Sequence, residues 1–148
     1  MPELCLFVYG TLRPGEGNHW RLAPHAARTE AAQMDGVAMF DLGVDPWPYA
    51  AASPDARISG DVVWISDDVD AHTLLSELDT YEVCDLEDPA NSLYTRVTRP
   101  ARLVASGELV EAWIYLAQGD TLQSLTEEFR VPSGDWRDAA SRPAPDGN

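Results

Sequence analysis

Hydrophobic residues gather in short runs along the 148-residue chain, and these runs predict five strands. The first run, residues 4–9, is almost continuously apolar or aromatic and stops at Gly10, as expected of a strand covered on both faces. Pro14, Gly15 and Gly17 then mark a loop. The other predicted strands are residues 36–41, 60–65, 94–104 and 109–116.

Apolar residues at helical spacing predict two helices. The first spans residues 70–80, where acids stand ahead of an apolar stripe; Asp is a favourable N-cap, and acids suit the positive end of the helix dipole. The second begins near Asp120. A shorter helical piece from about Trp20 is broken at Pro24, and two prolines make residues 45–49 irregular.

The order of these elements bounds the fold. Five strands with few helices, in no regular alternation, favour the α+β class, with the strands forming a small mixed β-barrel that carries a few short helices. No linker or repeat divides the chain, so we expect a single domain over residues 1–140. Residues 141–148, which hold two prolines and a glycine, are expected to form a flexible C-terminal tail.

Composition narrows the possible partners. The formal charge is −15, so binding to nucleic acid or to an anionic membrane is disfavoured. No apolar run approaches the roughly 20 residues that span a bilayer, and the N-terminus lacks a signal-peptide pattern. We therefore expect a cytoplasmic protein with both cysteines reduced, and the three scattered histidines indicate no metal site.

The first candidate for chemistry is the loop Tyr9-Gly10-Thr11-Leu12. A strand that breaks at Gly exposes successive backbone N–H groups, which can bind a carboxylate or an oxyanion without a cationic side chain. Gly10 also allows a ligand to approach the backbone closely. On spacing alone, a plain strand-to-loop turn explains this short motif better.

The second candidate is Glu82, one of several acids at the end of the first predicted helix. Position near a helix C-terminus and close to like charges should raise its pKa and suit it to act as a general base. The alternative is an ordinary solvated surface acid. Nearby, Cys84 is interpreted as a buried hydrophobe, and Arg96 as half of a structural ion pair with Glu82 or another acid.

Seven segments, taken in order, resemble the γ-glutamylcyclotransferase-like family, also called the AIG2-like family. Any one of them is weak, but their joint order and spacing over about residues 4–136 is specific. The segments are residues 7–15 with Asn18, residues 36–43 with Pro48-Tyr49-Ala50, Gly60 with residues 62–64, Leu78-Asp79 with Glu82, and residues 94–97, 112–115 and 133–136.

This resemblance implies a small mixed barrel and an enzyme that converts a γ-glutamyl amine or amide into 5-oxoproline and a free amine, a cyclisation classed with transferases or lyases. Residues 9–12 would bind the substrate, Glu82 would act as general acid and base, and Tyr115 would lie in the pocket wall. No cofactor or metal is implied, and the small γ-glutamyl substrate is the expected partner; oligomeric state stays open.

Two other readings stay open: a catalytically silent binding protein on the same fold, and an acidic interaction module suggested only by the charge. The presence of Glu82 favours the enzyme over the silent binder. Pro48-Tyr49 departs from the family's more usual Pro-Ala step, and the acidic residues 83–93 form a longer stretch that could cover the site. Arg13, Trp47 and Tyr49 are further candidates for selecting the amine.

Overall fold

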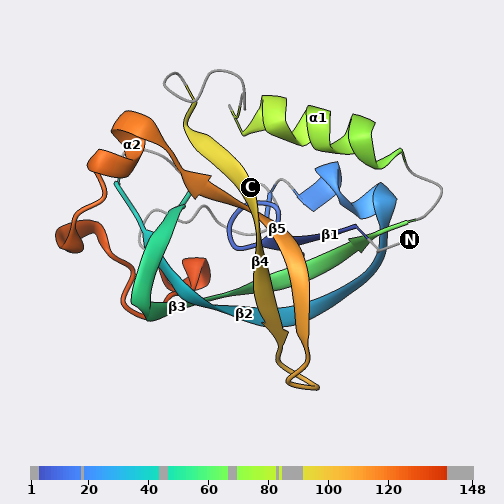
Figure 1. Ribbon diagram of the computed structural model, residues 1–148, viewed down its shortest axis with the longest axis horizontal. Coiled ribbons are helices and arrows are strands. Elements are labelled where there is room, and N and C mark those ends of the chain that lie inside the picture. The colour runs from blue at the N-terminus through green and yellow to red at the C-terminus, as the bar shows by residue number, and fades with distance from the viewer. Residues whose placement is uncertain are drawn as a thin grey trace.

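Five strands close into one barrel in the computed structural model, which describes residues 4–17, 19–43, 47–66, 70–82, 84 and 92–139 (Figure 1). The order around the barrel is β1-β3-β2-β4-β5, with β5 returning to β1. The predicted α+β class and the small mixed barrel are confirmed. The bounds of the strands are β1 Cys5–Val8, β2 Ala26–Phe40, β3 Tyr49–Ile65, β4 Tyr94–Leu103 and β5 Leu109–Ala117.

The hairpin of β2 and β3 is much longer than the predicted strands 36–41 and 60–65. The two strands pair from Ala26 with Ile65 to Phe40 with Tyr49, and the register shifts between Asp35 and Val37. The early half of β2 is rich in Ala and polar residues, so only its buried face, which includes Met34, contributes to the core. A strand of this composition lacks the apolar run on which the prediction relied.

The prediction that residues 45–49 are irregular is partly wrong. Tyr49 begins β3 and pairs with Phe40, whereas Trp47 and Pro48 precede the strand; residues 44–46 lie outside the described residues. Pro removes a backbone donor but does not stop the next residue from joining a sheet.

The short strand β1 completes the barrel. It runs antiparallel to β3 and parallel to β5, where Leu6 lies opposite Trp113. Close packing explains Gly60: a Cβ there would collide with the carbonyl oxygen of Val8 and lie 2.8 Å from Cζ of Phe7. Gly60 therefore lets β1 lie tightly against β3, which places the end of β1 accurately.

Helix α1, Ala71–Tyr81, packs across the barrel beside β1 and β5 (Figure 1) and confirms the helix predicted over residues 70–80. Asp70 caps it, since its carboxylate accepts hydrogen bonds from the backbone N–H of Thr73 at 3.3 Å and from the Thr73 hydroxyl at 3.0 Å. Leu74 and Leu78 are buried against the outer face of the barrel. Each contributes about 1.5–3 kcal/mol of hydrophobic stabilisation.

The other helical predictions are only partly right. Helix α2 spans Gly119–Gln123 and is followed by a separate 3-10 turn, Glu127–Phe129, so the second predicted helix is broken. Two 3-10 turns, His19–Arg21 and Ala23–His25, replace the helical piece near Trp20, and Pro24 lies in the first turn of the second one. None of the helices in the described part of the chain is both long and apolar enough to cross a membrane. The predicted tail, residues 141–148, lies outside the described residues.

Candidate active site

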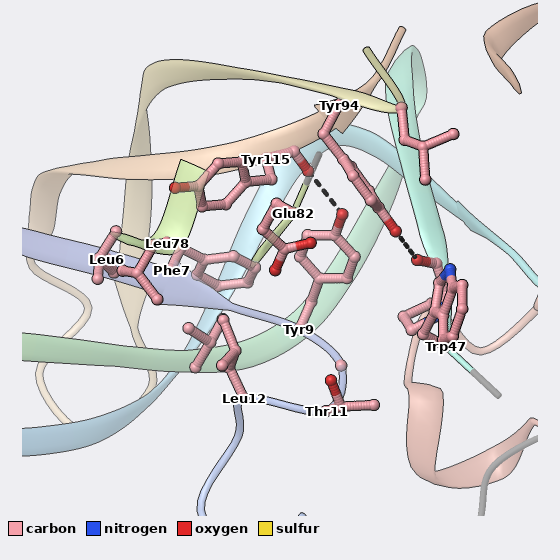
Figure 2. Close-up of a pocket in the computed structure, with 14 residues that line it drawn as sticks. Leu6, Phe7, Tyr9, Thr11, Leu12, Trp47, Leu78, Glu82, Tyr94 and Tyr115 are labelled. Atoms are coloured by element: carbon pink, nitrogen blue, oxygen red, sulfur yellow. Dashed lines mark hydrogen bonds between the residues drawn. The ribbon is translucent and has the colours of Figure 1, made fainter. Parts of the chain in front are cut away.

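A cavity of about 270 Å³ lies where the end of β1 meets α1 and the first residues of β4. Figure 2 shows aromatic rings and aliphatic side chains around it, with the Glu82 carboxylate turned inward between Tyr115 and Tyr9. The lining residues are Leu6, Phe7, Val8, Tyr9, Gly10, Thr11, Leu12, Trp47, Pro48, Leu78, Glu82, Leu93, Tyr94 and Tyr115. All six residues that sequence analysis placed in the site therefore line one cavity.

The loop of residues 9–12 forms one end of this cavity. Tyr9 is buried, and its hydroxyl donates a 2.6 Å hydrogen bond to the backbone oxygen of Tyr115. A Cβ at Gly10 would lie 2.7 Å from two ring carbons of Pro48, so glycine is needed for the loop to pack against this proline. The backbone N–H of Arg13 then bonds to the oxygen of Gly10 at 3.1 Å and closes the turn.

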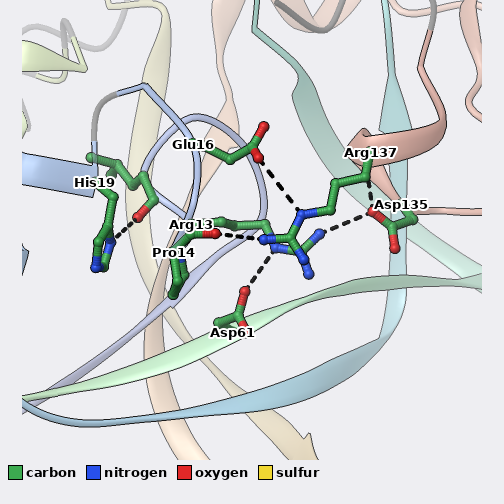
Figure 3. A network of polar contacts seen from close by, with 8 residues as sticks. Arg13, Pro14, Glu16, His19, Asp61, Asp135 and Arg137 are labelled. Carbon is green, nitrogen blue, oxygen red and sulfur yellow. Dashed lines mark hydrogen bonds and ion pairs between the residues drawn. The ribbon is translucent and has the colours of Figure 1, made fainter. Parts of the chain in front are cut away.

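Arg13 holds the loop from outside the cavity. Its Nε donates to Asp61 of β3 at 2.8 Å and its terminal nitrogen donates to Asp135 at 2.9 Å, with the guanidinium almost fully buried (Figure 3). Arg137 adds a 2.6 Å hydrogen bond to the oxygen of Pro14. Arg13, which sequence analysis considered for selecting the substrate, does not line the cavity; it ties the loop to the sheet and to the C-terminal turn.

The segment Ser133-Gly134-Asp135-Trp136 is the other half of this anchor. Gly134 has a φ of +71°, and its oxygen accepts a 2.8 Å hydrogen bond from the backbone N–H of Ser59 in β3. Trp136 is fully buried in the barrel core. Residues 133–136, the last segment of the family resemblance, therefore help to hold the loop of residues 9–12, because Asp135 accepts a hydrogen bond from Arg13.

Glu82 follows the last residue of α1, and its backbone N–H still bonds to the oxygen of Leu78 at 2.8 Å. Within the described residues, no group donates a hydrogen bond to its carboxylate. Burial raises the pKa of Glu82 to about 7, against the opposing effect of the positive charge of Arg21. The predicted direction of the shift is confirmed, but its main cause is burial rather than neighbouring acids.

Arg96 pairs with Asp79 and not with Glu82. Its Nε and a terminal nitrogen donate to the two carboxylate oxygens of Asp79 at 2.8 and 3.0 Å, a bidentate pair, while its guanidinium carbon stands 4.5 Å from the ring centroid of Trp113. The Tyr115 hydroxyl donates to the same carboxylate at 2.7 Å. This cluster fastens the last turn of α1, and with it Glu82, to β4 and β5.

Three tyrosines of the described part of the chain line the cavity, and each of their hydroxyls donates a hydrogen bond to a protein acceptor. Tyr9 donates to the oxygen of Tyr115, Tyr94 donates to the oxygen of Pro48 at 2.8 Å, and Tyr115 donates to Asp79. Tyr94 also stacks on Tyr49, which lies behind it and not in the lining. The tyrosines therefore present mainly ring surface to the cavity.

The interpretation of Cys84 as a buried hydrophobe agrees with its position in the structure. Cys84 is buried, and burial together with the negative charge of Asp79 raises the pKa of its thiol, so it stays neutral near pH 7. In the described ranges, no three His, Cys, Asp or Glu side chains gather as a metal site would require.

Sequence reasoning missed much of the wall, including Leu78, Leu93 and Tyr94. Leu78 and Tyr94 belong to predicted elements and to segments of the family resemblance, but neither was assigned to the pocket. No local signal separates such positions from ordinary core residues, because they become pocket residues only when α1 crosses the end of β4.

Comparison with known proteins points to one family. The model of the family described as gamma-glutamyl cyclotransferase, AIG2-like, matches residues 6–138. A protein of Vibrio cholerae serotype O1 that carries a provisional gamma-glutamylcyclotransferase name is 31% identical over 132 residues, which cover 88% of this chain and 93% of that protein.

Solved structures show the same fold. An AIG2-like protein from mouse superposes with a TM-score of 0.66 at 20% identity, over 100% of this chain and 99% of the mouse chain. YkqA from Bacillus subtilis gives a TM-score of 0.63 at 25% identity over 92% of this chain, which spans only 40% of YkqA. The order of the motifs, the closed barrel and these matches together lead to one conclusion: the chain belongs to the AIG2-like gamma-glutamyl cyclotransferase family.

Proposed function

We propose that this protein is an enzyme that cyclises γ-glutamyl compounds to 5-oxoproline and releases an amine. The observation that carries the proposal is the Glu82 carboxylate, which is turned into a cavity that also holds the loop of residues 9–12 (Figure 2). With its pKa raised to about 7, Glu82 can both accept and return a proton at neutral pH. Family membership supports the same chemistry.

The reaction needs one bond to form and one to break. The α-amine of the γ-glutamyl group attacks the γ-carbonyl carbon, and a new C–N bond closes the five-membered ring. Glu82 accepts the proton lost by the attacking nitrogen and delivers it to the nitrogen of the original amide as that C–N bond breaks. Since the nucleophile belongs to the substrate, the protein supplies positioning and proton transfer.

The loop of residues 9–12 would hold negative charge. Backbone N–H groups at Gly10, Thr11 and Leu12 would bind either the substrate α-carboxylate or the oxyanion that develops on the γ-carbonyl oxygen. Anchoring by Arg13, whose guanidinium is buried between two carboxylates, keeps this loop in place before substrate arrives. Preorganised donors of this kind are more effective than donors that must first be ordered.

A panel of γ-glutamyl amino acids and γ-glutamyl amines, with mass-spectrometric detection of 5-oxoproline, tests this proposal. The matched controls are the corresponding α-glutamyl isomers, whose amide is placed differently from the α-amine, and reactions without protein. We expect 5-oxoproline from at least one γ-glutamyl compound and from no α-glutamyl isomer. If calorimetry shows that panel members bind while none is cyclised, the protein is a silent binder and not an enzyme.

A further inference from the structure

We propose that the amine released by this enzyme is an uncharged, apolar one, so that the preferred substrates are γ-glutamyl derivatives of alkyl or aryl amines, not of amino acids or peptides. The inference rests on the proposed function and adds the identity of the leaving group. It follows from what the cavity offers to the part of the substrate beyond the reacting amide.

The first observation is the apolar character of the wall. Away from Glu82 and the loop, the cavity is bounded by Leu78, Leu93, Trp47, Pro48 and the rings of Tyr94 and Tyr115. The Trp47 indole N–H, a polar group in this wall, donates to the Tyr49 hydroxyl at 3.0 Å. Such a surface gains free energy from burying hydrocarbon and gives little to a polar leaving group.

The second observation is that the tyrosine hydroxyls are already engaged. A carboxylate on the amine portion would need hydrogen-bond donors, but the hydroxyls of Tyr9, Tyr94 and Tyr115 donate to acceptors within the protein. Recruiting any of them would break an existing hydrogen bond and leave its acceptor without that donor. That cost opposes the binding of a polar amine portion.

The third observation is the distribution of cations. The described lining contains no Arg or His, the chain contains no Lys, and Arg96 is occupied by Asp79. Arg21 is the cation whose field acts on Glu82, at the reacting end. A second carboxylate on the substrate would therefore be desolvated without a counter-charge.

Matched substrates test this directly. γ-Glutamyl-isobutylamine and γ-glutamyl-valine differ only in the carboxylate of the amine portion, and γ-glutamyl-1,4-diaminobutane carries a positive charge instead. We expect kcat/KM for the isobutylamine derivative to exceed that for the valine derivative by roughly 10- to 100-fold, as an unmatched polar group commonly costs. We expect the diaminobutane derivative to be disfavoured as well, because its ammonium group would leave water for a wall whose indole and hydroxyl groups already bond within the protein.

The outcomes separate this inference from the proposed function. Equal or faster release of 5-oxoproline from the valine or the diaminobutane derivative would overturn the inference while leaving the cyclisation activity established. Absence of 5-oxoproline from all three would overturn both.

A variant provides an independent check. Leu93 is only partly buried and lines the wall, so Leu93→Arg introduces a cation there, and Leu93→Gln serves as the matched polar control. We expect the Arg variant to lower the isobutylamine-to-valine ratio of kcat/KM by at least about tenfold, and the Gln variant to lower it less. Because each ratio is measured within one protein, loss of folded enzyme cancels. An unchanged ratio in the Arg variant would contradict the inference.

Discussion

Glu82 combines two properties that rarely occur together in a carboxylate: it is partly buried, and among the described residues it receives no hydrogen bond. Asp79, one helical turn earlier, has the opposite environment, with three donated hydrogen bonds from Arg96 and Tyr115. The two carboxylates, Asp79 and Glu82, are therefore suited to different roles. Asp79 is an acceptor committed to structure, whereas the carboxylate of Glu82 is available to exchange a proton.

The pH dependence of turnover follows from the raised pKa of Glu82. A general base must be ionised, so kcat/KM should fall on the acidic side with an apparent pKa near 7, far above the ordinary value of 4.5. A pH–rate profile from pH 5 to 8.5 with one γ-glutamyl substrate measures this. Full activity maintained down to pH 5 would show that Glu82 is not the base.

The same shift predicts a cost in stability. Since the pKa is raised in the folded state, ionisation of Glu82 opposes folding, and the destabilisation grows as pH rises from about 4.5 to 7. Glu82→Gln should therefore raise the free energy of unfolding at pH 8 by about 1–2 kcal/mol, below the full value of the shift because the side chain is partly exposed. Urea unfolding at pH 8 and pH 5 tests this. A gain as large at pH 5 as at pH 8 would contradict it.

At the level of single residues, sequence reasoning found the acid but not its environment. The raised pKa was expected from a helix end and from neighbouring acids, yet burial causes it. The Glu82 side chain is buried because Leu78, Tyr9 and Tyr115, from three separate segments of the chain, lie around the same cavity. Such a meeting has no local signature in the sequence.

Among the elements, α1 matters most for the site because Glu82 directly follows its last residue. Two leucines hold the helix on the barrel, but the Asp79 cluster fixes the end of the helix by binding both β4 and β5. The Glu82 carboxylate, the proposed base, is therefore three residues along the chain from the largely buried ion pair of Asp79 with Arg96.

Asp79→Ala should loosen this end of α1. Removal of the carboxylate leaves Arg96 without its bidentate partner, and we expect a loss of about 1–3 kcal/mol in the free energy of unfolding. We also expect a lower kcat and an acidic limb shifted to lower pH, because a mobile Glu82 is better solvated. Glu77→Ala, which removes an exposed acid from the same helix, is the control and should change stability by less than about 0.5 kcal/mol. An unchanged acidic limb in Asp79→Ala would show that Asp79 does not position Glu82.

The sequence predicted the elements well where an apolar run or a cap marks them, as in β1, β5 and α1. It failed where tertiary pairing overrides local pattern. The first half of β2 joins the sheet by pairing with β3. The pairing is interrupted at Gly36, which has a φ of +81°, and residues 53–56 of β3 have no paired residue in β2 there. A prediction from periodicity cannot foresee this pairing, because it depends on residues far along the chain.

For the whole molecule, closure of the barrel is what assembles the cavity. The end of β1, residues 47–48, the end of α1 and the strands β4 and β5 are distant in sequence, and they converge because β1 lies between β3 and β5. Mouse and bacterial relatives keep this fold at 20–25% identity. The family resemblance could therefore predict this fold, and the six residues it placed in the site line one cavity.

The formal charge of −15 is also a property of the whole molecule, and it affects which substrates can approach. It opposes the approach of anionic substrates, and in the proposed mechanism the N–H groups of residues 9–12 supply the attraction for one carboxylate. A second carboxylate would meet the same unfavourable field without such a site, in agreement with the proposed apolar leaving group.

The central claim is that Glu82 moves the proton during cyclisation, and the most direct measurement is the rate of 5-oxoproline release by the parent protein and by Glu82→Gln on the same γ-glutamyl substrate. We predict a fall in kcat of roughly 10²- to 10⁴-fold in a variant that remains folded and at least as stable as the parent at pH 8. Undiminished release of 5-oxoproline by a folded Glu82→Gln variant would contradict the account.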